Sequence, residues 1–181
     1  TVLKILKASV IRIQANNGGA INSPCTTIAV SPGALSQLVF TTAPSAAATA
    51  GSALATQPVV VEQDANGNTV TSASDTITFT GYSDTSCTAT VAGGVQASGN
   101  GVAAASGVAS FASLTMLKTG VIRIRANNGG AINSPCTVIA VASGGLTQLV
   151  FTTAPSGAAT AGTALSTQPV VAEQDANGNT I

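Results

Sequence analysis

The sequence lacks histidine and tryptophan altogether, and only 7% of its 181 residues are charged. Without histidine, a serine or cysteine nucleophile has no imidazole base to activate it. Six Lys and Arg residues balance six Asp and Glu residues, so the formal net charge is zero and no basic surface for nucleic acid is indicated. We therefore expect a protein that is not an enzyme, with no catalytic residues, no cofactor and no bound nucleic acid.

Long apolar runs are also missing. No stretch approaches the roughly 18 to 20 consecutive apolar residues that a membrane helix requires, so we expect no membrane insertion within this segment. Leu, Glu, Lys and Arg, which favour helices, are scarce, whereas β-branched residues are common and 19 residues are Gly. This composition favours strands and turns. Because only 3% of the residues are aromatic, we expect a thin core of small side chains.

What the sequence does contain is a tandem repeat. Residues 10–30 read VIRIQANNGGAINSPCTTIAV and residues 121–141 read VIRIRANNGGAINSPCTVIAV, an offset of 111 positions (121 − 10). Cys25 returns at the same offset as Cys136. Roughly three-quarters of the overlapping positions are identical, which indicates an array of repeated structural units.

The repeat divides the chain into three parts. Residues 1–34 form the C-terminal part of one repeat, residues 35–146 form a complete repeat, and residues 147–181 form the N-terminal part of the next. Connectors of a few residues, 31–34 and 143–145, join them, so we expect neighbouring units to lie end to end in a semi-rigid rod. We expect each partial repeat to be completed by further sequence or by a strand from another molecule.

Short runs with period-two alternation predict strands. In the run that ends the complete repeat, Ile122, Ile124 and Ala126 share one face of an extended chain, and Arg123 and Arg125 share the other. The predicted strands of the complete repeat are 37–42, 57–63, 75–83, 86–91, 102–105, 108–113, 121–126 and 136–141, with an irregular edge segment at 45–53. Turn signals recur between them, so we predict an all-β, antiparallel two-sheet sandwich of Greek-key topology.

The three cysteines follow the repeat. Each complete repeat carries two, at the positions of Cys87 and Cys136, and Cys25 is the second cysteine of the preceding repeat. We predict a disulfide between Cys87 and Cys136, with the partner of Cys25 outside this chain. Such a bridge stabilises a domain by about 4 kcal/mol in the chain-entropy model and indicates an oxidising compartment. Buried free thiols and a metal site are the alternatives.

One turn carries a weak calcium signal. Asp64, Asn66 and Asn68 have the spacing that begins a calcium-binding loop, and Glu62 is close by. Residues 69–74 supply no bidentate glutamate, so the alternative is a tight turn in which Asp and Asn cap their own backbone. We predict no other metal site.

Three further patterns have both an ordinary and a functional interpretation. Lys118, Arg123 and Arg125 form either a solvated strand face or a small cationic site. The row Thr76, Thr78 and Thr80 is either an ordinary solvated face or a flat face for ice or glycan. Lys118 is also a candidate for an isopeptide crosslink with an asparagine.

A family resemblance emerges from longer segments. PVVVEQDANGNTVTSASDTITFT, then GVASFASL, then KTGVIRIRA together resemble the bacterial immunoglobulin-like repeats of large surface proteins of the invasin and intimin type. The resemblance covers most of residues 37–142. It implies extracellular, tandemly arrayed sandwich domains that act as stalks, spacers or fibres, and it implies no catalytic residues.

Two functions are consistent with these patterns. The first is a non-catalytic structural module of a long bacterial or archaeal surface protein, whose partner is itself, through neighbouring repeats or through strands donated between copies. The second is an adhesin repeat that binds glycan or a cell-surface receptor. An exposed aromatic cluster at one end of the sandwich would distinguish the second, and Tyr82 is the only tyrosine.

Overall fold

A computed structural model describes residues 2–96 and 98–181. It contains no helix among these residues, in agreement with the predicted all-β class. The strands are β1 (Ser9–Ile13), β2 (Thr26–Val30), β3 (Leu35–Thr42), β4 (Ala47–Thr49), β5 (Val59–Asp64), β6 (Thr76–Tyr82), β7 (Val102–Ala103), β8 (Val108–Ser110), β9 (Gly120–Asn127), β10 (Thr137–Ala142), β11 (Gln148–Thr153) and β12 (Val170–Gln174).

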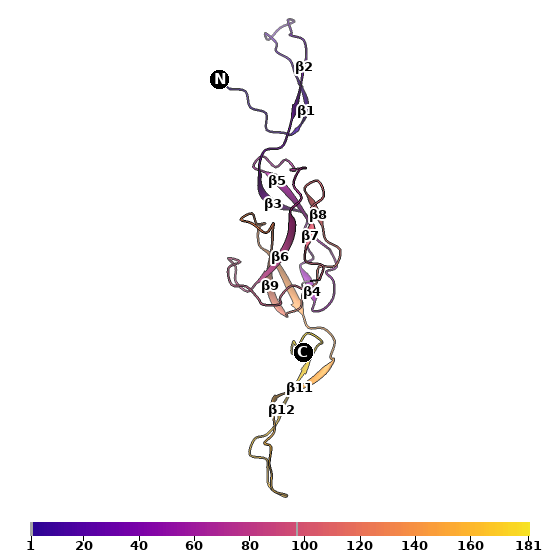
Figure 1. The fold of residues 1–181 in the computed structure, drawn as a ribbon, viewed down its shortest axis with the longest axis vertical. Coiled ribbons are helices and arrows are strands. Elements are labelled where there is room, and N and C mark those ends of the chain that lie inside the picture. Colours follow the sequence, from indigo (N-terminus) through magenta and orange to yellow (C-terminus); the bar gives the residue numbers. More distant parts are fainter. Residues whose placement is uncertain (1, 97) are drawn as a thin grey trace.

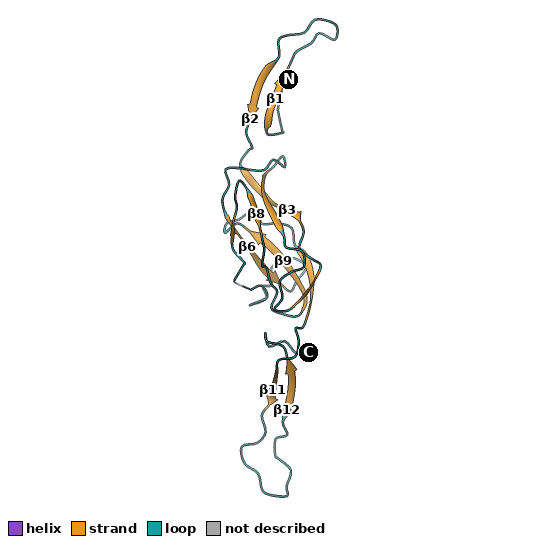
Figure 2. Ribbon diagram, turned by 90° about the vertical axis from the view of Figure 1, so that its right-hand side faces the viewer, coloured by secondary structure: helices purple, strands orange, loops and turns teal. Residues whose placement is uncertain are grey.

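Two sheets form the centre of the molecule. One has five strands in the order β4-β10-β9-β6-β7, and the other has three in the order β3-β5-β8. The pairs within them are antiparallel except for β4, which runs parallel to β10. Figure 2 shows the two groups of strands lying across one another in the central body, which is consistent with a two-layer β-sandwich.

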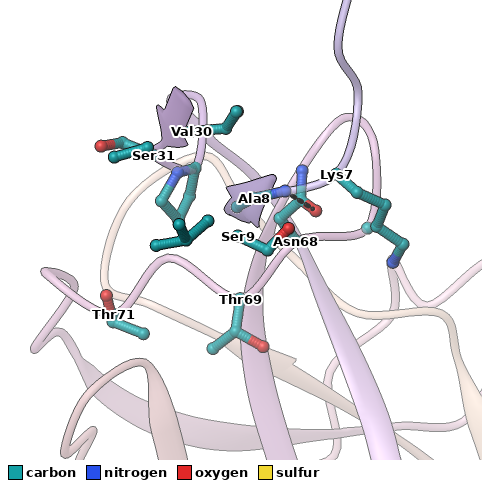
Figure 3. A pocket seen from close by; sticks show the side chains of 12 residues that line it. Lys7, Ala8, Ser9, Val30, Ser31, Asn68, Thr69 and Thr71 are labelled. Atoms are coloured by element: carbon teal, nitrogen blue, oxygen red, sulfur yellow. Dashed lines mark hydrogen bonds between the residues drawn. The ribbon is translucent and has the colours of Figure 1, made fainter. Parts of the chain in front are cut away.

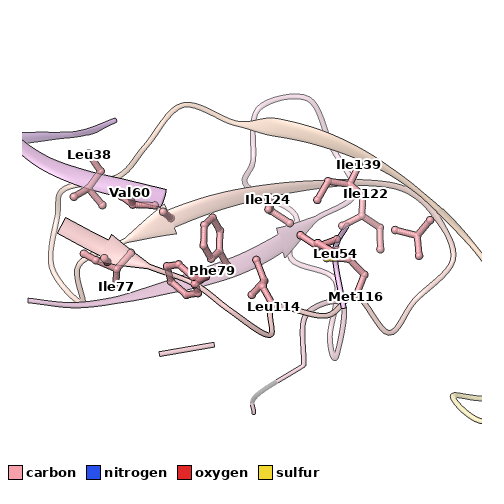
Figure 4. Close-up of a cluster of buried hydrophobic side chains, with 14 of the residues drawn as sticks. Leu38, Leu54, Val60, Ile77, Phe79, Leu114, Met116, Ile122, Ile124 and Ile139 are labelled. Atoms are coloured by element: carbon pink, nitrogen blue, oxygen red, sulfur yellow. The ribbon is translucent and has the colours of Figure 1, made fainter. Parts of the chain in front are cut away.

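The core lies between these two sheets. On β6, Ile77 and Phe79 are buried, whereas Thr76 is exposed and Thr78 and Thr80 are half-buried, as the alternating faces of a strand require. Phe79 from the five-stranded sheet stacks on Phe40 of β3 at a centroid distance of 5.9 Å and meets Phe111 edge-on at 4.9 Å. Figure 4 shows Phe79 among aliphatic side chains from both layers. The rest of the core is mainly Leu, Ile, Val and Met, with only a few Ala, so the expectation of a core of small side chains was wrong.

The ends of the molecule are two separate hairpins. β1 pairs with β2, and β11 pairs with β12, and the hairpins extend from opposite ends of the central body (Figure 1). Their registers match those of the corresponding strands in the complete repeat: Val10 faces Ala29 as Val121 faces Ala140. The whole chain is therefore elongated, with the three parts arranged in line.

Two local predictions were wrong. Residues 86–91 do not form a strand: Cys87 has a φ of 52° and lies in a loop. The carboxylate of Asp84 accepts hydrogen bonds from the N–H groups of Thr88 and Ala89 and from the Thr88 hydroxyl, and these bonds favour a turn over an extended chain. In the segment 45–53, predicted as irregular, Ala47–Thr49 forms the edge strand β4.

Ser106 and Gly107 form a tight turn between β7 and β8, but these two strands belong to different sheets. Ser106 and Gly107 have φ values of 52° and 78°, as a two-residue hairpin turn requires. The strands on either side, β7 and β8, pair with β6 and β5 respectively. The turn therefore connects one sheet to the other.

Candidate functional site at the junctions between repeats

The turn Asp64–Asn68 is organised around one carboxylate. Oδ1 of Asp64 accepts hydrogen bonds from the backbone N–H of Asn66 at 2.8 Å and of Asn68 at 2.9 Å. Oδ2 accepts from the side-chain amide of Asn68 at 2.8 Å and from the N–H of Gly33 at 2.8 Å. The Asn68 amide and these N–H groups hold the pKa of Asp64 well below its usual range. Gly33 belongs to the connector, so the Asp64 carboxylate bonds the connector as well as the backbone of its own turn.

The same turn also binds the preceding partial repeat. The Nδ2 of Asn68 donates to the carbonyl of Leu6 at 2.8 Å, and the N–H of Ala8 donates to Oδ1 of Asn68 at 2.9 Å. Figure 3 shows Ala8 and Asn68 facing one another. They lie beside a cleft of about 530 Å3 that is lined by the first hairpin, the connector and the turn. The first junction is thus held by hydrogen bonds from two distant segments, residues 6–8 and Gly33.

The second junction repeats this bonding pattern 111 residues later (179 − 68). Asn179 donates to the carbonyl of Leu117 at 2.8 Å and accepts from the N–H of Thr119 at 3.4 Å. Asp175 accepts from the N–H of Gly144 at 2.9 Å. The side chain of Asn179 is the main cause that lowers the pKa of Asp175 to about 2, and the N–H of Gly144 contributes. Two independent junctions therefore share one set of contacts.

The second junction has one additional contact. The Nζ of Lys118 donates to the carbonyl of Asn177 at 3.4 Å. This places one of the three clustered cations at the junction. Arg125 lies elsewhere, with its guanidinium 5.4 Å from the centre of the Tyr82 ring, and Arg123 is half-buried on β9.

The geometry of the Asp64 turn matches the capped-turn alternative. A carboxylate has about four lone-pair positions, and the four donors described above use all of them. The Asn66 side chain is exposed, and Glu62 is buried on β5. Among the described residues, no group of three or more His, Cys, Asp or Glu side chains is placed to hold a metal ion.

The predicted disulfide between Cys87 and Cys136 is present. It joins the loop after β6 to the residue that precedes β10, and these two strands flank β9 in the five-stranded sheet. Cys25 is free and exposed in this chain, and its pairing with a cysteine outside the sequence stays a prediction.

Sequence reasoning missed a pair of carboxyl groups inside the complete repeat. Glu62 is fully buried, and neither of its carboxylate oxygens has a hydrogen-bond partner. Burial, followed by the nearby charge of Asp75, raises the pKa of Glu62 to about 7. Asp75 itself accepts a hydrogen bond from the side-chain amide of Asn128 at 2.7 Å. The alternation of β5 contains the signal, because Glu62 lies two residues after the core residue Val60.

The threonine row on β6 is only partly free. Thr76 is exposed, whereas Thr78 and Thr80 are half-buried. The hydroxyl of Thr78 donates to Oδ1 of Asn127 on the neighbouring strand at 3.0 Å. One of the three hydroxyls is thus used within the sheet.

A scan against protein-family models finds no match to this chain, and a search of curated proteins finds no similar sequence. Among the described residues, no helix has the length and apolar character needed to cross a membrane.

Proposed function

We propose that this chain is a non-catalytic structural module, part of an array of immunoglobulin-like repeats that forms a surface stalk or fibre. One observation carries the proposal: both junctions have the same hydrogen bonds. The Asp of the turn accepts from the connector, and the Asn of the turn donates to and accepts from the preceding unit. A repeated junction gives each unit the same orientation relative to the last, which is what a spacer of defined length requires.

Three features support a mechanical role. Each connector is only a few residues long and is bound to an aspartate, so the hinge has little freedom. The Cys87–Cys136 disulfide limits how far the complete repeat extends under load and favours an oxidising, extracellular location. The strand order of the two sheets and the repeated crossing between them support a Greek-key sandwich like that of the bacterial surface repeats the sequence resembles.

We also propose that copies of this chain associate through their terminal hairpins. Leu149 and Val171 are 67% and 50% exposed, whereas the corresponding Leu38 and Val60 are 1% and 0% exposed in the complete repeat. The same side chains thus face solvent at the ends and a core in the centre. A donated strand from a second copy would cover part of these faces.

Small-angle X-ray scattering of the oxidised protein tests the structural proposal. We expect the scattering of an extended rod, in agreement with the arrangement in Figure 1. A dilution series separates this from self-association, since only the latter depends on concentration. A compact particle, or the profile of freely jointed units, would contradict a spacer of fixed length.

A further inference from the structure

We propose that the turn Asp64–Asn68 is a clamp that recognises the backbone, and not the side chains, of the repeat that precedes it. Its partner is a three-residue segment whose first carbonyl and last N–H both bond the asparagine side chain. Residues 6–8 occupy this position at the first junction and residues 117–119 occupy it at the second. This inference rests on the proposed array and specifies how its units are joined.

The asparagine of the clamp imitates a strand. A side-chain amide has one carbonyl and one NH2 group, so it can accept from one peptide and donate to another, as a neighbouring strand does. Asn68 does both, to Ala8 and Leu6. Asn179 makes the same two bonds to Thr119 and Leu117. Both asparagines are buried, so the alternative partner, water, is largely excluded.

The aspartate of the clamp fixes this amide before the partner is bound. Besides its bond to Leu6, the Nδ2 of Asn68 donates to Oδ2 of Asp64, so both of its hydrogens are used. The same oxygen accepts from Gly33 of the connector. A side chain held in one rotamer loses little entropy when it binds. Two attachment points, at residues 6–8 and at Gly33, then restrict rotation about the connector.

The sequence differences between repeats agree with recognition of the backbone. The clamp reads DANGN in both copies, at 64–68 and at 175–179. The clamped segment differs, with Ala8 replaced by Thr119 at the equivalent position. Because only main-chain atoms of this position take part, the clamp can join repeats whose side chains differ there.

The clamp also gives the array a direction. Each turn binds the unit on its N-terminal side, and the bound segment 117–119 leads directly into β9 of the complete repeat. We therefore expect each repeat to support the strand β9 of the repeat before it. The clamp as defined here does not include a contact to the unit on its C-terminal side.

The test compares Asn68→Ala with Asn66→Ala in the full chain. Asn66 is the matched control, since it lies in the same turn but its side chain is exposed. Amide hydrogen exchange measured by NMR should become about tenfold faster at Ala8 in Asn68→Ala and should be unchanged in Asn66→Ala. A second pair of variants leaves the turn itself unchanged. Ala8→Pro removes the N–H that donates to Asn68 and should also release the segment. Ala8→Thr places the residue of the second junction at this position and should leave the segment bound.

Distances between spin labels provide an independent measurement. One label is placed on the free, exposed Cys25 and the other on Ser110→Cys, an exposed residue of β8. We expect a narrow distance distribution in the parent and in Asn66→Ala, and a broad one in Asn68→Ala and Ala8→Pro. Unchanged exchange at Ala8 in Asn68→Ala, together with an unchanged distance distribution in Asn68→Ala and in Ala8→Pro, would overturn the clamp. A distribution that is already broad in the parent would instead overturn the proposed rod.

Discussion

Asp64 and Asp175 each accept hydrogen bonds from two parts of the chain, the turn and the connector. A carboxylate can accept several such bonds, which explains why aspartate recurs at both junctions. The sequence left a calcium loop and a capped turn as the two interpretations of residues 64–68, and the local bonds match the capped turn. The bonds to residues 6–8 and to Gly33 could not be predicted, because they depend on how one unit is placed on another. Hydrogen bonds within a turn follow from a few consecutive residues, whereas hydrogen bonds between units depend on residues that are distant in the sequence.

The junction should resist acid. The pKa of Asp175 is lowered from 3.8 to about 2, so its stabilising contribution is complete above pH 3.8 and is lost as the pH falls through about 2. The N–H of Gly144 reports on this carboxylate directly. We expect its NMR chemical shift to titrate with a midpoint near 2, and the titration to vanish in Asp175→Asn. A midpoint near 4 would show that the carboxylate lacks these bonds in solution.

Glu62 should make the complete repeat less stable at high pH. Its pKa is raised from 4.5 to about 7, so between these values the unfolded chain has ionised while the folded chain retains its proton. The free energy of unfolding therefore falls as the pH rises from 4.5 to 7 and then levels off. Glu62→Gln should remove this slope and exceed the parent in stability at pH 8.

Urea unfolding at pH 5 and pH 8 measures the effect of Glu62. Glu173→Gln is the matched control, because Glu173 is the equivalent residue in the last hairpin and is exposed. It should leave the slope unchanged. A slope that persists in Glu62→Gln would place its origin in another group.

At the scale of single elements, strands were predictable where alternation meets a buried face. β6 and β9 have buried apolar residues at every second position, and their location and orientation followed from the sequence. Residues 86–91 have β-favouring composition, yet they form a loop because their backbone N–H groups donate to the side chain of Asp84 and not to a neighbouring strand. The partners of β7 and β8 were also beyond local reasoning, since each pairs with a strand distant in sequence.

Two leucines at equivalent positions of the repeat lie in different environments, and comparing them tests the core. Leu38 on β3 is 1% exposed and Leu149 on β11 is 67% exposed. Measured at a dilution at which copies do not associate, Leu38→Ala should destabilise the protein by about 2 to 5 kcal/mol, whereas Leu149→Ala should change stability by less than about 0.5 kcal/mol. Denaturant titration measures both. A comparable loss in Leu149→Ala would mean that the last hairpin is covered in solution.

The disulfide should contribute a large share of the stability of the complete repeat. Removing it by replacing Cys87 and Cys136 with serine should lower the free energy of unfolding by about 4 kcal/mol in the chain-entropy model. Cys25→Ser is the control, because this cysteine is free and exposed, and it should have no effect. Thermal unfolding under oxidising conditions distinguishes the variants. An equal loss from Cys25→Ser would assign the stabilisation to a different bond.

At the scale of the whole molecule, the end-to-end arrangement of the units was predictable, but the hydrogen bonds that hold neighbouring units together were not. The 111-residue offset and the short connectors indicated consecutive units. The fixed orientation depends on the two clamps, which bring together residues about 60 positions apart, such as Ala8 and Asn68. The three parts are therefore expected to move as one body.

Residual dipolar couplings measured by NMR in a single alignment medium test this directly. Couplings from the first hairpin, the complete repeat and the last hairpin should all fit one alignment tensor with the geometry described here. Three tensors of different magnitude would show that the parts reorient independently, and the account of a fixed, clamped rod would then be wrong.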